Sequence, residues 1–215
     1  MCSETILFPE KDFDGYIFDL DGTLVDSMPL HFHSWRETLR SFGAPFELTW
    51  ETLGSMAGAG PRRVVELLNQ KWGCDLPPDD VAEEKENYFI KNISGIPPIH
   101  PVFEFARERH AKGKPLAVAT GSCAEVAACL LQGIGGHELF QAIITPADVS
   151  KGKPAPDMFF LAAKLMGVAP EKCVVFEDGV LGIRGAEAAG MEWVFIPSPS
   201  PKDTPTKQCE PIARH

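Results

Sequence analysis

Cysteine is scarce in this chain, and its placement follows no pattern used by disulfide frameworks or zinc sites. Among 215 residues there are six cysteines, none in a CxxC pair or at metal-ligand spacing: Cys2, Cys74, Cys123, Cys129, Cys173 and Cys209. We interpret them as reduced thiols and expect a cytoplasmic protein. The one short apolar run near the amino terminus, residues 6–8, has no basic segment before it. We therefore expect neither a secretory signal nor a membrane-spanning helix.

Positive charge is the second shortage. Lysine and arginine number 20 against 30 aspartates and glutamates, which gives a formal net charge of −10. Nucleic acids and anionic membranes bind clustered cations, so neither is an expected partner. The negative net charge does not exclude a small anionic ligand, because such a ligand responds to the local field of a few cations and backbone amides.

Apolar residues are plentiful, at 44% of the chain, which suffices for one large domain or a core with a smaller insert. Short apolar runs alternate with helical periods, which indicates an α/β architecture with a parallel sheet. Candidate strands are residues 15–20, 115–119, 141–144, 173–176 and 193–196. Candidate helices are residues 101–112, 123–132, 156–167 and 180–189.

The gap between the first two candidate strands, about 95 residues, is too long for a simple crossover. Its apolar residues recur at helical spacing, as in Phe32, Trp35, Leu39 and Phe42. We interpret the gap as a helical cap over the strand ends that excludes water and shapes a pocket. A helical layer without a ligand role is the alternative. The expected division is a core of residues 1–27 and 99–197, a cap of residues 28–98 and a tail of residues 198–215.

The motif DLDGT at residues 19–23 follows the apolar residues 16–18. Residues two apart on a strand project to the same side, so Asp19 and Asp21 can converge at its end. Two carboxylates so close repel each other unless a cation or a shared proton relieves them. Gly22 permits a sharp turn that brings backbone N–H groups near the first carboxylate. We interpret the motif as a metal-dependent phosphoryl-transfer site, with an acidic helix-capping loop as the alternative.

Three further segments place polar groups at or near the ends of apolar runs. The run at residues 114–119 ends in Thr-Gly-Ser, and the run at residues 173–176 ends in Glu-Asp-Gly. Between them, residues 151–157 supply Lys153 just before a helix that starts with proline. Ligands of an open parallel sheet bind beyond the carboxyl ends of its strands, so we expect all four motifs to meet.

With the four motifs in this order, the sequence resembles the haloacid dehalogenase superfamily of phosphotransferases over about residues 14–197. It looks most like the β-phosphoglucomutase group, and within it like sugar-phosphate phosphatases related to fructose-1-phosphate and 6-phosphogluconate phosphatases. Ser27, His31 and Trp35 support this narrower placement. The resemblance implies a Rossmann-like parallel sheet with helices on both faces, a small inserted α-helical cap, and hydrolysis of small phosphorylated sugars or sugar acids.

The resemblance also implies a division of roles among the core residues. Asp19 would be the nucleophile that forms an aspartyl-phosphate. Asp21 would protonate the leaving oxygen and then deprotonate the incoming hydroxyl, and we expect the adjacent anionic site to raise its pKa. Thr120 and the Gly121 N–H would contact the transferring phosphoryl group, and Lys153 would neutralise it together with Asp19.

Mg²⁺ is the expected cofactor, because a hard divalent cation prefers oxygen ligands and keeps several waters. The expected ligands are Asp19, Asp178 and the Asp21 carbonyl, with Glu177 holding a metal-bound water. A helix-capping acidic turn is the alternative interpretation of Glu177 and Asp178.

Substrate specificity is expected to lie largely in the cap. The expected substrate-binding residues are Leu20, Gly121, His31, Arg62 and Arg63. One of the two arginines would hold a second anionic group or orient the sugar, although lone arginines on helices are more often solvated. His31 resembles the mutase-group histidine near the general acid, and a histidine on a polar helix face is the alternative.

Two departures from the mutases favour a phosphatase, in which water resolves the aspartyl-phosphate. Cys123 and Ala124 stand where mutases carry polar side chains, and Lys85 does not align cleanly with the mutase cap lysine. The alternatives are a β-phosphoglucomutase-type sugar phosphomutase and a non-catalytic binding protein on the same scaffold. We expect a monomer or a weak dimer.

Overall fold

The computed structural model describes residues 6–197, so the expected tail of residues 198–215 lies outside the described residues. One parallel sheet of five strands has the order β3-β2-β1-β4-β5. The strands are β1 (Gly15–Phe18), β2 (Leu116–Ala119), β3 (Ala142–Ile144), β4 (Cys173–Glu177) and β5 (Glu192–Phe195). Each strand begins and ends within two residues of its predicted range, so the predicted parallel α/β sheet is confirmed.

Eight α-helices are described in residues 6–197, five of them between β1 and β2, and the first four of these five lie within residues 28–98. These four are α1 (Met28–Ser41), α2 (Trp50–Gly54), α3 (Pro61–Trp72) and α4 (Pro78–Asn92). The others are α5 (His100–Ala111), α6 (Ala124–Gly133), α7 (Asp157–Met166) and α8 (Val180–Ala188). Proline in the first turn begins α1, α3, α4 and α5, where its fixed φ suits a helix and its missing N–H costs no intrahelical bond.

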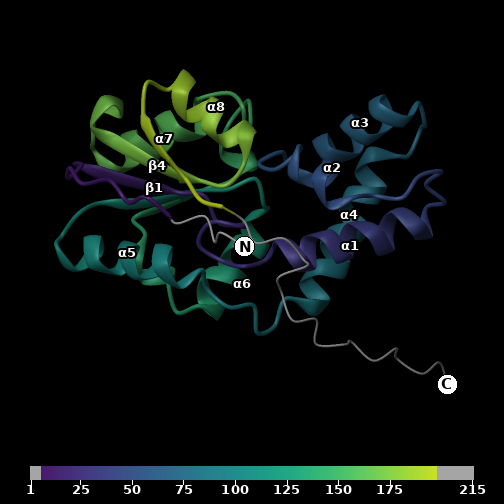
Figure 1. Ribbon diagram of the computed structural model, residues 1–215, viewed down its shortest axis with the longest axis horizontal. Helices are drawn as coiled ribbons and strands as arrows, with labels where there is room; N and C mark the ends of the chain where they lie inside the picture. Colours follow the sequence, from purple (N-terminus) through teal and green to yellow (C-terminus); the bar gives the residue numbers. More distant parts are fainter. Residues whose placement is uncertain (1–5, 198–215) are drawn as a thin grey trace.

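The sheet is covered on both faces, which explains why β1, β2 and β4 are buried at every residue. Along β1 the side chains alternate between two apolar clusters. Tyr16 and Phe18 pack in the cluster that includes α5 and α6, whereas Ile17 packs in the cluster that includes α7. Figure 1 shows α5 and α6 on one side of the sheet and α7 and α8 on the other. The central strand is therefore rigidly held, and so is the motif that follows it.

Helices α1 to α4 form a lobe beside the sheet, with an apolar cluster of their own (Figure 1). Trp35, Leu68 and Val81 are among its buried residues. The two connections to the core run side by side, because Asp26 N–H donates to the Pro97 carbonyl at 3.0 Å. We retain residues 28–98 as a proposed cap on the strength of this separate cluster. Within residues 6–197 no helix combines the length and apolar character needed to cross a bilayer.

Candidate active site

The four motifs converge at the carboxyl ends of β1, β2 and β4. Asp19 follows β1, Glu177 ends β4, and Lys153 reaches both from the loop before α7. The Lys153 ammonium donates to Asp19 Oδ1 at 2.6 Å and to Glu177 Oε2 at 2.7 Å. All three side chains are buried. An ammonium between two carboxylates, removed from water, holds the predicted nucleophile in a fixed position.

Asp178 completes an acidic cluster with Asp19 and Glu177, in which one oxygen of each carboxylate lies within 4.8 Å of the others. Burial, together with repulsion from Glu177, raises the pKa of Asp19 to about 8 despite Lys153. Burial and the charges of Asp19 and Glu177 likewise raise the pKa of Asp178 well above its usual range. Three carboxylates against one ammonium leave an excess of negative charge, and an all-oxygen donor set of this kind fits a hard divalent cation.

Glu177 has less freedom to bind a cation directly than its two neighbours. Its Oε2 accepts from Lys153, and its Oε1 accepts from the Gly179 N–H at 3.0 Å. Asp178 instead packs against the turn of the DLDGT motif, where Gly22 has a φ of +84° and a Cβ would lie 2.3 Å from Asp178 Oδ2. Glycine is required there both for the backbone conformation and for the close approach of this carboxylate.

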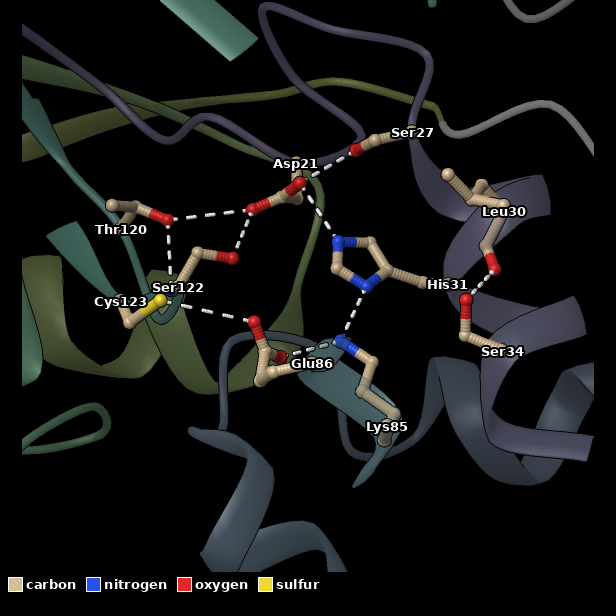
Figure 2. Close-up of polar contacts among 10 residues, drawn as sticks. All are labelled: Asp21, Ser27, Leu30, His31, Ser34, Lys85, Glu86, Thr120, Ser122 and Cys123. Carbon is tan, nitrogen blue, oxygen red and sulfur yellow. Dashed lines mark hydrogen bonds and ion pairs between the residues drawn. The ribbon is translucent and has the colours of Figure 1, made fainter. Parts of the chain in front are cut away.

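Asp21 belongs to a separate network, shown in Figure 2. It accepts hydrogen bonds from Ser27 Oγ at 2.6 Å, Ser122 Oγ at 2.7 Å and His31 Nε2 at 2.8 Å. Burial alone would raise the pKa of Asp21, but His31 and the hydroxyl donors hold this pKa well below its usual range. The sequence-based expectation of a raised pKa is therefore wrong for this arrangement, because it considered the anionic neighbours and not the donors.

His31 connects Asp21 to a buried lysine of the cap. Lys85 Nζ lies 2.8 Å from His31 Nδ1 and donates to Glu86 Oε1 at 2.7 Å (Figure 2). An ammonium can only donate, so His31 Nδ1 must accept and the ring proton resides on Nε2, facing Asp21. Burial and the Lys85 charge lower the pKa of His31, which favours this neutral form.

Lys85 is the functional side chain that sequence reasoning undervalued. It is only 2% exposed and lines the cavity, so it is not the solvated residue that its charged neighbours in the sequence suggest. The available signal was its position on α4, four residues after Val81 and four before Phe89, both of which are buried. This spacing puts all three on one helix face, and that face is turned inward.

Thr120 and Gly121 follow the last residue of β2 at the wall of the site. Thr120 is buried, and its hydroxyl lies 3.4 Å from Asp21 Oδ2 and accepts from the Ser122 N–H at 3.0 Å. Leu20 sends its side chain into the apolar core, so any role in substrate binding falls to its backbone. Ser122, to which sequence reasoning gave no role, is the residue of this segment that bonds Asp21 most closely.

A cavity of about 70 Å³ lies between the core motifs and the cap. Its core wall includes Asp19, Asp21, Gly121 and Ser122. Its cap wall includes Met28, His31, Trp35, Leu53, Met56, Val64 and Lys85. The chain thus places the predicted nucleophile and the predicted acid–base residue at one enclosed space.

Arg62 and Arg63 are not among the residues around this cavity. They line an adjoining, wider groove of about 740 Å³. Arg62 pairs with Asp79 at 2.8 Å and with Glu66 at 3.2 Å, and Arg63 pairs with Glu66 at 2.9 Å. Both side chains are more than half exposed, which matches the solvated alternative considered for them.

The cap loop at residues 57–60 closes over core glycines. A Cβ on Gly179 would lie 2.8 Å from the Ala57 carbonyl oxygen, and one on Gly121 would lie 3.1 Å from the Gly58 carbonyl oxygen. Backbone approaches of this kind exclude any larger residue on the core side. The glycines therefore permit the close contact that encloses the cavity.

Two phosphatases of known name are similar in sequence to this chain over most of its length. Fructose-1-phosphate phosphatase YqaB of Escherichia coli is 36% identical over 185 residues, covering 86% of this chain and 96% of that protein. A phosphorylated carbohydrates phosphatase of Thermotoga maritima is 30% identical over 184 residues, covering 85% of this chain and 84% of that protein.

Solved structures share the fold as well. The crystal structure of CbbY from Rhodobacter sphaeroides with xylulose-(1,5)bisphosphate superposes with a TM-score of 0.73 at 26% identity, covering 84% of each chain. The family model for haloacid dehalogenase-like hydrolases matches residues 13–190, nearly all of the described chain. With this match and with relatives at 30% and 36% identity, the chain belongs to the haloacid dehalogenase-like hydrolases.

Proposed function

We propose that this protein is a Mg²⁺-dependent phosphatase of small phosphorylated sugars that works through an aspartyl-phosphate on Asp19. The observation that carries the proposal is the separation of two neighbouring carboxylates. Asp19 lies in an acidic cluster beside Lys153, whereas Asp21 lies in a network of hydrogen-bond donors. Two carboxyl groups in such different surroundings suit two different chemical roles.

In the first step, an oxygen of the Asp19 carboxylate attacks phosphorus and the bond from phosphorus to the sugar oxygen breaks. Lys153, the Thr120 hydroxyl and the Gly121 N–H would offset the charge on the phosphoryl oxygens. Asp21 gives its proton to the departing sugar oxygen. Because the pKa of Asp21 is low beside its donors, this proton is taken up with the substrate, whose phosphate charge raises that pKa.

In the second step, the Asp21 carboxylate takes a proton from water while the water oxygen attacks phosphorus. The acyl-phosphate bond breaks, inorganic phosphate leaves and Asp19 is restored. His31 and Ser27 hold Asp21 in position for both proton transfers. The low pKa of Asp21 beside these donors suits a group that must be ionised when water arrives.

The donor set fits the proposed cation. Asp19, Asp178 and the Asp21 carbonyl would hold Mg²⁺, and Glu177, whose oxygens already accept two hydrogen bonds, would hold a metal-bound water. A bound Mg²⁺ supplies positive charge that offsets the phosphate and the carboxylates. The pKa values of Asp19 and Asp178 are raised because their carboxylates are buried together, and a bound cation would relieve this repulsion.

The test is phosphate release from a panel of sugar phosphates by the purified protein, with Mg²⁺ and with chelator. Fructose-1-phosphate, β-glucose-1-phosphate, 2-deoxyglucose-6-phosphate, 6-phosphogluconate and phosphoglycolate separate the neighbouring activities. We expect Mg²⁺-dependent release from at least one hexose phosphate. Absence of release from every sugar phosphate, with phosphoglycolate hydrolysed instead, would move the substrate class away from sugars.

The β-phosphoglucomutase-type reaction is the second candidate, and the position of Lys85 in the cavity favours it. A mutase would convert β-glucose-1-phosphate to glucose-6-phosphate with a bisphosphate primer and without release of inorganic phosphate. The same panel, with both products measured, separates the two reactions. The expected cytoplasmic location and the expected monomer or weak dimer stay predictions.

A further inference from the structure

The cap side of the cavity is poor in positive charge. Eight of its side chains are apolar: Met28, Trp35, Leu53, Met56, Ala57, Ala59, Pro61 and Val64. Among the described residues around this cavity, the cation contributed by the cap is Lys85, beside the neutral His31. A substrate group that enters this cavity beyond the transferring phosphate therefore meets a largely apolar wall.

The charge of Lys85 is already matched inside the protein. Its ammonium donates to Glu86 at 2.7 Å and lies 2.8 Å from His31 Nδ1, which uses two of its three protons. The ammonium also lies 4.9 Å from the centroid of the Phe89 ring, within cation–π distance. Glu86 is largely buried as well, with a side chain 15% exposed. The pair thus offers a neutral surface with one free N–H, suited to a hydroxyl.

The nearby arginines do not add positive charge to the wall of this cavity. Arg62 and Arg63 line the adjoining groove, and their guanidinium groups pair with Asp79 and Glu66. A second phosphate or a carboxylate placed in the cavity would lose its water and gain only a cation, Lys85, whose charge Glu86 already offsets. A sugar hydroxyl carries no such penalty, because one hydrogen bond replaces the water it loses.

We propose that this cavity selects monophosphates of neutral sugars and polyols and discriminates against sugar bisphosphates and phosphorylated sugar acids. The inference rests on the proposed phosphatase function and narrows its substrate class, which the sequence left open to sugar acids. It also sets this chain apart from its structural neighbour CbbY, which has been crystallised with a bisphosphate.

The first test compares matched substrates in the full-length protein with Mg²⁺. Fructose-1-phosphate is paired with fructose-1,6-bisphosphate, and glucitol-6-phosphate with 6-phosphogluconate. We expect kcat/KM for phosphate release to be lower for the charged member of each pair by about 30-fold or more, which corresponds to about 2 kcal/mol. A charged member within threefold of its neutral partner would overturn the proposal.

Binding separates failure of this inference from failure of the proposed function. If no neutral monophosphate releases phosphate, the proposed function fails, and the same pairs are then compared by calorimetry on the Asp19→Asn protein. Tighter binding of the neutral member would still support the selectivity. Equal or tighter binding of the charged member would contradict it.

Glu86→Gln tests the origin of the selectivity. Loss of the carboxylate leaves the Lys85 charge uncompensated, so kcat/KM for 6-phosphogluconate relative to glucitol-6-phosphate should rise by about tenfold. Glu83→Gln is the matched control, because Glu83 is exposed on the same helix and its replacement changes the net charge equally. The control ratio should stay within twofold of wild type. If the ratio of kcat/KM values rose equally in the two variants, the selectivity would come from the overall charge of the protein, and the role proposed for the cavity would be refuted.

Discussion

The imidazole of His31 on α1 lies 2.8 Å, through its Nε2 atom, from Oδ1 of Asp21 in the DLDGT motif. The donor belongs to the proposed cap and the acceptor to the core, so the hydrogen bond forms across their boundary. Lys85 fixes the ring tautomer from the other side. Asp21, the proposed acid–base residue, therefore keeps all of its donors only when the helices of the proposed cap are in place over the core.

Lys85→Met should lower kcat by about tenfold, because His31 loses the donor that fixes its tautomer. The free energy of unfolding should fall, because the substitution leaves the carboxylate of Glu86, whose side chain is only 15% exposed, without its partner. Steady-state kinetics and thermal unfolding check the two parts. Lys91→Met, on an exposed position of the same helix, is the control. Parallel loss of activity in both variants would contradict this role of Lys85.

Stability without Mg²⁺ should fall as pH rises. The pKa of Asp19 is raised from 3.8 to about 8 on folding, so between these values the folded state binds more protons than the unfolded state. The free energy of unfolding then decreases with pH across that window. Thermal unfolding at pH 5 and pH 8 in chelator measures the decrease, and added Mg²⁺ should restore more stability at pH 8 than at pH 5.

Asp19→Asn should remove the proposed nucleophile and also the electrostatic repulsion of Asp19 from Glu177 and Asp178. Turnover of sugar phosphates should disappear, whereas the metal-free protein should be more stable than wild type at pH 8 and less sensitive to pH. The fold should be retained, because Lys153 keeps its second partner, Glu177. Phosphate release above a few per cent of wild type would rule out the covalent mechanism.

Gly179→Ala should disturb closure of the cap without unfolding the core. The added methyl group would lie 2.8 Å from the Ala57 carbonyl oxygen, so the loop must move away. We expect kcat/KM to fall about tenfold, since misplacement of about an ångström can cost more than this. Gly54→Ala in α2 is the control, because no atom lies within 4 Å of its added Cβ. Unchanged kinetics in Gly179→Ala would show that this contact does not matter for catalysis.

The core site could be predicted from the sequence because each of its parts is a local signal at the end of an apolar strand. Asp19, Thr120 and Glu177 all follow this rule. The interactions between the cap and the core could not be predicted in the same way. Lys85 is surrounded in the sequence by charged residues that suggest a solvated helix, and only the spacing from Val81 marks its inward face.

The lowered pKa of Asp21 could not be predicted from the sequence either. The sequence shows its acidic neighbours, whereas the donors come from α1 and from the turn after β2, at separations that the fold alone determines. The five-residue helix α2 was also missed, because so short a segment has no measurable period. Cap geometry depends on tertiary packing, so the sequence could not show that Arg62 and Arg63 pair with Asp79 and Glu66 beside the wider groove.

Asp21→Ala should slow release of phosphate from sugar phosphates by about 10²-fold or more, the usual scale for general acid–base catalysis. The two steps can be separated with p-nitrophenyl phosphate, whose leaving group needs no proton. With this substrate the variant should still form the aspartyl-phosphate, but water attacks it slowly because the base is missing. We expect a burst of nitrophenol equal to the enzyme concentration, followed by slow turnover, and no burst of free sugar from fructose-1-phosphate. Ser27→Ala, which removes one donor and keeps the carboxylate, should show a smaller loss and no burst. A variant at residue 21 that turns over sugar phosphates within tenfold of wild type would show that another group transfers the proton.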